Sequence, residues 1–81
     1  RRVARAEKVK AYLEEHPVIR PQDSQEVLGE SKSVLRTLLR DHLEPAGVVV
    51  FKNFYYERAK DWEQRMTDFL VDPSTPAESQ P

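Results

Sequence analysis

The segment SKSVLRTLLRDHLEP carries cations and hydroxyl groups at a spacing that could bind a polyanion. These residues are Lys32, Ser33, Arg36, Thr37 and Arg40. On a helix, which turns by about 100° per residue, Lys32 lies at the edge of the arc opposite the leucines and the other residues fill it. A guanidinium can donate two parallel hydrogen bonds to a guanine edge or to a phosphate, and hydroxyl groups can donate to either. The chemistry of this helix face therefore permits contact with phosphates and base edges.

Two further groups of residues could extend this surface. Lys52 and Asn53 separate the strand-like runs VVVF and FYY, so we expect them at the tip of a hairpin. Asparagine would tolerate the positive φ that such a short connection requires. Arg1, Arg2 and Arg5 form a basic cluster near the N-terminus, which could rest on a nucleic-acid backbone.

Each of these candidates also has a plainer structural interpretation. Charged residues on the outer face of an amphipathic helix ordinarily serve to keep it in water. Arg36 and Arg40 could instead form weak surface ion pairs, each worth less than about 1 kcal/mol. Their partners would be Glu30, Asp41 and Glu44. Turn chemistry alone accounts for the residues at the hairpin tip, and the N-terminal arginines could be a solvated terminus.

The sequence offers little for catalysis or metal binding. It has no cysteine, so neither disulfides nor thiolate metal ligands are available. His16 precedes a proline and His42 lies within the apolar arc of the third helix, so they do not form the i, i+4 pair of a helical metal site. With only Gly29 and Gly47, the chain has no glycine-rich phosphate-binding loop. We therefore expect no enzyme, no cofactor and no metal.

Length and charge set further bounds. The 81 residues allow one small domain with a single core. The net charge of −1 is unusual for a nucleic-acid-binding domain, although Lys and Arg slightly outnumber Asp and Glu over residues 1–44. No apolar stretch approaches the roughly 20 residues of a membrane span and no signal-peptide pattern is present, so we expect an intracellular protein, in cytoplasm or nucleus. Because the chain begins with Arg1, we expect it to be part of a longer protein.

Hydrophobic periodicity and helix breakers divide the chain into four helices and one hairpin. The helices are expected at about residues 3–15, 21–28, 31–43 and 57–71, and the hairpin at about 48–56. Gly29 should end the second helix, and Ser31 should cap the third. The fold class is thus mainly α with a small β-hairpin, in one domain over residues 1–71. Residues 72–81 contain three prolines and no large apolar side chain, so we expect a disordered tail or linker there.

The apolar residues outside the third helix indicate where the core and the edges lie. The run VIR at 18–20 is long enough to add an edge strand to a small sheet. Trp62, Met66 and Phe69 recur at helical spacing in the last helix and should pack in the core. Phe54 and Tyr55 alternate across the hairpin, so one of the two should be exposed.

The order of these elements resembles that of the winged helix-turn-helix superfamily. The segment LGESKSVLRTLLRDHLEPAGVVV is similar to that superfamily's turn, recognition helix and first wing strand, and the resemblance covers roughly residues 6 to 71. Within the superfamily, the stretch from Val18 to Tyr56 faintly resembles the winged-helix repeats of the selenocysteine-specific elongation factor, which bind an RNA hairpin. This chain reads Ser31-Lys32-Ser33 where those repeats often have a basic Ser-Arg-Lys, and its wing is shorter and less basic.

The superfamily resemblance implies a nucleic-acid-binding module. The third helix would enter the major groove of duplex DNA, and the wing tip would touch the neighbouring backbone. Two alternatives remain open at this point. One is a winged helix used for protein–protein interaction within a larger assembly, which the near-neutral charge favours, and the other is binding to an RNA hairpin.

Overall fold

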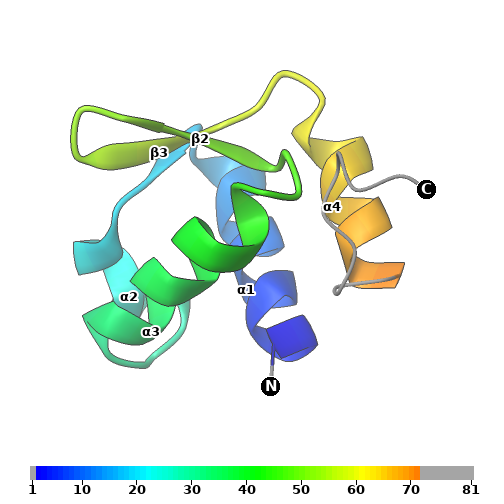
Figure 1. Cartoon of the computed structure of the whole chain (residues 1–81). Coiled ribbons are helices and arrows are strands. Elements are labelled where there is room, and N and C mark those ends of the chain that lie inside the picture. The colour runs from blue at the N-terminus through cyan, green and yellow to red at the C-terminus, as the bar shows by residue number, and fades with distance from the viewer. Residues whose placement is uncertain (1, 72–81) are drawn as a thin grey trace.

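The computed structural model of the chain describes residues 2–71, with side chains from residue 4 onward. These residues form a mainly helical fold with a small three-stranded antiparallel sheet (Figure 1), as expected from the sequence at this level. In chain order the elements are α1 (Arg2–Glu15), β1 (Val18–Ile19), the 3-10 helix η1 (Pro21–Asp23), α2 (Ser24–Val27), α3 (Lys32–Leu38), the π-helix η2 (Leu39–Leu43), β2 (Val49–Lys52), β3 (Tyr55–Arg58) and α4 (Trp62–Val71). No helix among these is both long and apolar enough to cross a membrane. The expected tail, residues 72–81, lies outside the described residues.

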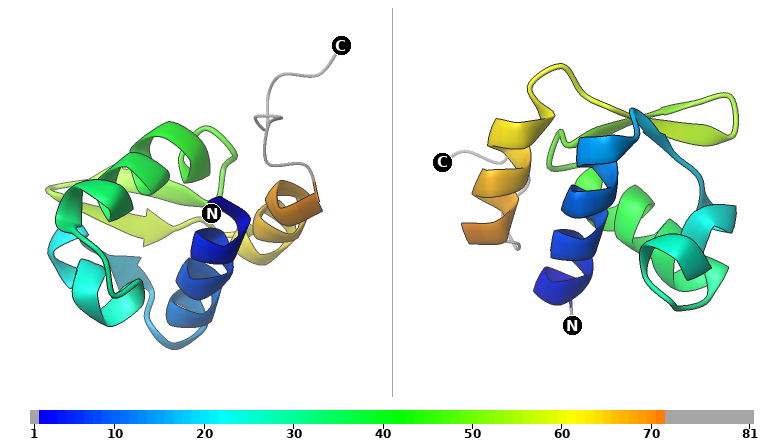
Figure 2. Two further views of the ribbon diagram at one scale, coloured as in Figure 1. Left: turned by 90° about the horizontal axis from the view of Figure 1, so that it is seen from below. Right: turned by 180° about the vertical axis from the view of Figure 1, so that it is seen from behind.

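The sheet has β3 at its centre, with β1 and β2 antiparallel on either side. The two residues of β1 pair with Glu57 and Tyr56, which confirms the edge strand expected within VIR. The hairpin of β2 and β3 extends past β1 toward one end of the molecule (Figure 1). Both views in Figure 2 place α1 and α4 side by side, away from the closed end of the hairpin.

The core joins the apolar faces of α1, α2, α3, η2 and α4 to the sheet. Its fully buried side chains include Leu13 of α1, Leu35 of α3, Leu39 of η2 and Met66 of α4. The expected core residues of the last helix are confirmed, since Trp62, Met66 and Phe69 are all buried. The burial of this one contiguous cluster fixes the helices against the sheet, so that their outer faces are held in set positions.

The second helix is shorter than expected, because residues 21–28 divide into η1 and α2. The Asp23 amide donates to the Arg20 carbonyl at 2.9 Å, and the Arg20 amide donates to the Asp23 carboxylate at 3.1 Å. These two bonds close a tight 3-10 turn before the α-helix begins. Gly29 follows α2 with φ of +70°, which confirms it as the residue that stops the helix.

The third helix begins where the sequence predicts, but its second half is wound differently. Ser31 occupies the N-cap position, yet its hydroxyl makes no capping bond and lies 3.3 Å from the Ser33 hydroxyl. From Leu39 onward the helix widens to π geometry, with the Glu44 amide donating to the Leu39 carbonyl at 2.8 Å. Pro45 has no N–H to donate to the carbonyl four residues back, so an α-helical pattern could not continue there.

Two predicted boundaries around the hairpin are wrong. The turn is Asn53-Phe54 rather than Lys52-Asn53, because Lys52 pairs with Tyr55 as the last rung of the ladder. The left-handed residue is Phe54, with φ of +70°, and not the asparagine. The last helix was expected from residue 57 but begins at Trp62, because β3 continues through Arg58 to pair with Val49.

Candidate nucleic-acid interface

The residues predicted to bind lie together on the exposed side of α3 and its continuation η2. All of Lys32, Ser33, Arg36, Thr37 and Arg40 are exposed, while the leucines on the opposite side of the helix are buried. The helical spacing predicted from the sequence therefore holds across the change from α to π geometry. We refer to these five residues as the α3 face.

The cations of the α3 face differ in what they contact. Arg40 donates to both oxygens of the Asp41 carboxylate, at 2.8 and 3.3 Å. This hydrogen bonding lowers the pKa of Asp41 and raises that of Arg40. Within residues 2–71, Lys32 and Arg36 form no ion pair. Lys32 at the start of α3 and Arg36 in its last turn are thus left uncompensated by any carboxylate in contact with them.

Tyr56 of β3 is a buried aromatic residue whose ionisation responds to charges of the α3 face. Its pKa is raised, mainly by burial and next by the charge of Glu44, whereas Arg40 and Arg36 act in the opposite direction. Its ring also contacts that of Phe51, its partner across the strands, with centroids 5.0 Å apart.

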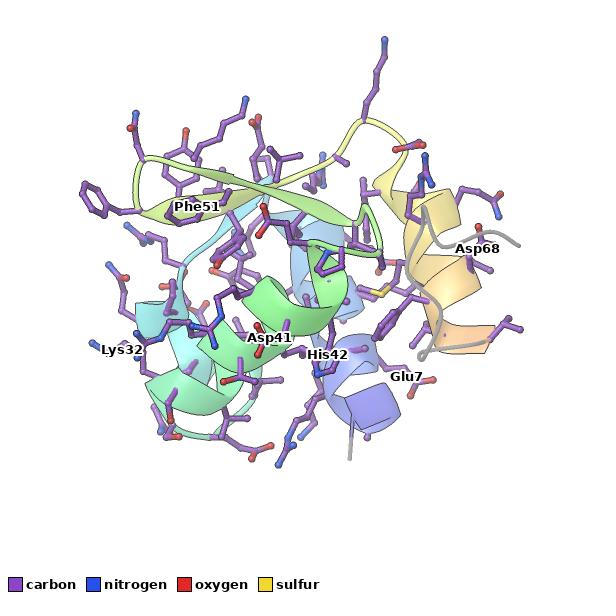
Figure 3. All side chains as sticks on the ribbon, in the orientation of Figure 1. Glu7, Lys32, Asp41, His42, Phe51 and Asp68 are labelled. Carbon is purple, nitrogen blue, oxygen red and sulfur yellow. The ribbon has the colours of Figure 1, made fainter. Side chains whose placement is uncertain are left out.

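Phe51 is a candidate interface residue that the sequence interpretation missed. It shares the core-facing side of the sheet with Tyr56, but it lies beyond the core and is 52% exposed. In Figure 3, Phe51 and Lys32 lie toward the same side of the molecule, on the opposite side from Asp68 of α4. The pairing of Phe51 with Tyr56 would have placed Phe51 on this side of the sheet. That pairing can be assigned only once the turn is placed at Asn53-Phe54.

The hairpin tip carries less free charge than its sequence suggests. The Lys52 ammonium lies 2.8 Å from the Glu57 carboxylate, and this contact raises the pKa of Lys52. Asn53 is exposed. Phe54 is 88% exposed, which confirms the expectation that one of the two aromatic residues at this end of the hairpin faces solvent. The tip is therefore mainly apolar and neutral.

Of the three arginines in the N-terminal cluster, Arg5 is the one whose side chain the structure describes. The Arg5 guanidinium donates two hydrogen bonds of 2.9 Å to the Glu30 carboxylate, just before α3. This interaction raises the pKa of Arg5 and lowers that of Glu30. It also occupies Glu30, which was a possible partner for the arginines of α3. Arg2 opens α1, but its side chain and the whole of Arg1 lie outside the described residues.

Within the part of the chain that the structure describes, neither histidine lies in a cluster of metal-binding side chains. His16 stacks on Tyr12 with ring centroids 4.2 Å apart. Among the residues that the structure describes, no group of three His, Cys, Asp or Glu side chains could hold a metal ion.

Comparisons of the chain with protein-family models, with curated proteins and with solved structures give no match. The function must therefore be argued from the geometry of this surface.

Proposed function

We propose that this chain is a winged helix-turn-helix module that binds duplex DNA through the α3 face and the β2–β3 hairpin. Support comes from the order of its elements, in which two short helices separated by a glycine turn are followed by a hairpin. A helix with an exposed polar face fits the major groove, which is about 12 Å wide. The hairpin, lying beside that helix, would reach the adjoining backbone.

The observation that carries this proposal is the uncompensated charge on the α3 face. Lys32 and Arg36 are exposed, lack a carboxylate partner within residues 2–71 and stand beside the hydroxyls of Ser33 and Thr37. Arg36 would donate to a guanine edge or to a phosphate, and the hydroxyls would donate to phosphate oxygens. Arg40 would exchange its exposed contact with Asp41 for a phosphate, at little cost because surface pairs are weak.

The small net charge does not oppose this proposal. At physiological salt, exposed charges more than about 8 Å apart are largely screened from one another. The acidic residues of α4 include Asp68, which lies on the opposite side of the molecule from Lys32 (Figure 3). Asp68 would therefore have little effect on a phosphate bound near Lys32.

The test is a fluorescence-anisotropy titration of the chain with a short mixed-sequence DNA duplex over a range of salt concentrations. Counterion release predicts that the logarithm of the binding constant falls linearly with the logarithm of salt, by about 0.9 per phosphate neutralised. R36A should weaken binding by roughly tenfold, within the range of one bidentate base contact. K32A should weaken it less and reduce the salt slope by about one phosphate.

K60A is the matched control for K32A, because Lys60 is also an exposed lysine but lies in the connection before α4. It should leave both affinity and slope unchanged. The proposal would be wrong if duplex DNA failed to bind at low salt, or if K60A and K32A had equal effects. An RNA hairpin titrated in parallel should bind more weakly than the duplex.

A further inference from the structure

Phe54 stands out as a large apolar side chain that the fold does not use. It is the most exposed of the large hydrophobic residues that the structure describes, at 88%. It also has φ of +70°, a left-handed conformation that bulky residues rarely adopt because Cβ approaches the backbone. The ring therefore adds little to the core, while its backbone conformation costs free energy.

The turn itself gives no reason for a phenylalanine at this position. Asparagine and glycine tolerate the left-handed region far better, and Asn53 stands one residue away at a position without positive φ. Strained conformations that persist in a structure are concentrated at sites of binding and function. The exposed ring is thus a candidate contact residue.

Its place in the molecule relates it to the α3 face. Figures 1 and 2 agree that the closed end of the hairpin and the first turn of α3 point toward the same end of the molecule. Lys52, which stands two residues before Phe54 in the sequence, is already paired with Glu57. Phe51 on β2 is also partly exposed, and its ring contacts that of Tyr56 across the strands. A partner held by the uncompensated cations of α3 would therefore meet an apolar tip.

We propose that Phe54 is a wedge that enters the minor groove of duplex DNA and inserts its ring against a base step. This inference rests on the proposed DNA-binding function. With α3 in the major groove, the tip beside it reaches across the backbone to the adjoining minor groove. Apolar side chains inserted there partly unstack the bases and bend the duplex. The wedge should therefore favour the flexible TA and CA steps.

The experiment compares the wild-type chain with F54N and F54W on a duplex carrying 2-aminopurine at a TA step. Wild-type protein should raise 2-aminopurine fluorescence, which reports unstacking, and shorten the end-to-end distance measured by energy transfer between dyes on the two ends. F54N removes the ring and places a residue suited to positive φ, so it should unfold at a temperature equal to or above wild type. It should lose both signals and about tenfold in affinity, within the range for one base stacked on an aromatic ring. F54W keeps a ring and should retain both signals.

The outcomes separate this inference from the proposed function. If wild-type protein binds duplex with the expected salt slope but F54N matches it in affinity and in both optical signals, the wedge is wrong and the DNA-binding proposal stands. If wild-type protein does not bind duplex at low salt, both are wrong, and an exposed Phe54 would then indicate a protein partner. Loss of the optical signals in F54N, with the salt slope retained, supports both.

Discussion

At the scale of single residues, the pair of Arg5 and Glu30 connects α1 to the loop that precedes α3. Its two hydrogen bonds join residues 25 positions apart in the chain. The same loop is held by a hydrogen bond of 3.0 Å that the Gln25 side-chain Nε2 donates to the Glu30 carbonyl. Since α3 begins two residues later, these contacts help to set the position of the face that carries Lys32.

The Arg5–Glu30 pair should give stability a defined dependence on pH. The hydrogen bond from Arg5 lowers the pKa of Glu30 below its ordinary value of 4.5, so the unfolded chain takes up a proton more readily than the folded one. The stabilisation is then complete above pH 4.5 and is lost as pH falls through the lowered pKa. Urea unfolding from neutral pH to about pH 3 should show wild type losing more stability than E30Q. If the free energies of unfolding of wild type and E30Q fell equally as pH was lowered, the Arg5–Glu30 pair would not be the source of this pH dependence.

At the scale of elements, the buried and exposed faces of the helices could be predicted from the sequence better than the residues at which helices and strands begin and end. The buried leucines of α3 and the stop at Gly29 follow from local periodicity and backbone preference, and both were predicted. The hairpin turn and the start of α4 depend on which residues of β2 and β3 pair, and that register is decided by contacts across strands. The partner of Arg5 depends on how α1 packs against a distant loop, which local patterns cannot show.

Gly29 allows a test of the turn that precedes α3. An added Cβ would meet no atom within 4 Å, so a substitution there acts through the backbone alone. At φ of +70°, G29A should destabilise the fold by about 1 kcal/mol, and G29N should cost less because asparagine tolerates this region. Chemical denaturation of both variants measures the difference. Equal losses would show that something other than φ governs this position.

At the scale of the whole molecule, Arg58 links the sheet to α1 and α4. Its guanidinium donates to the Leu13 carbonyl in the last turn of α1 and lies 5.7 Å from the centre of the Trp62 ring. In a continuous helix, that carbonyl would accept from the amide four residues later. That residue is Pro17, which has no N–H. Arg58 therefore supplies both the missing donor and a positive charge at a helix C-terminus that has no basic residue of its own.

Removing that donor should weaken the whole domain without touching the proposed interface. R58M keeps the aliphatic stem but leaves the Leu13 carbonyl without its donor, so we expect a loss of about 1 to 3 kcal/mol in the free energy of unfolding. R58K, which keeps a charge and a donor, should lose less. Denaturation with urea measures both, with K60M as a control that removes a neighbouring exposed charge.

Because the sheet, α1 and α4 share this one side chain, R58M should lower the cooperative midpoint of all of them together. Under conditions where R58M remains folded, its affinity for duplex DNA should equal that of wild type, since Arg58 is not part of the α3 face or the hairpin tip. A stability equal to wild type, or separate transitions for α4 and the sheet, would show that the link does not hold the elements together.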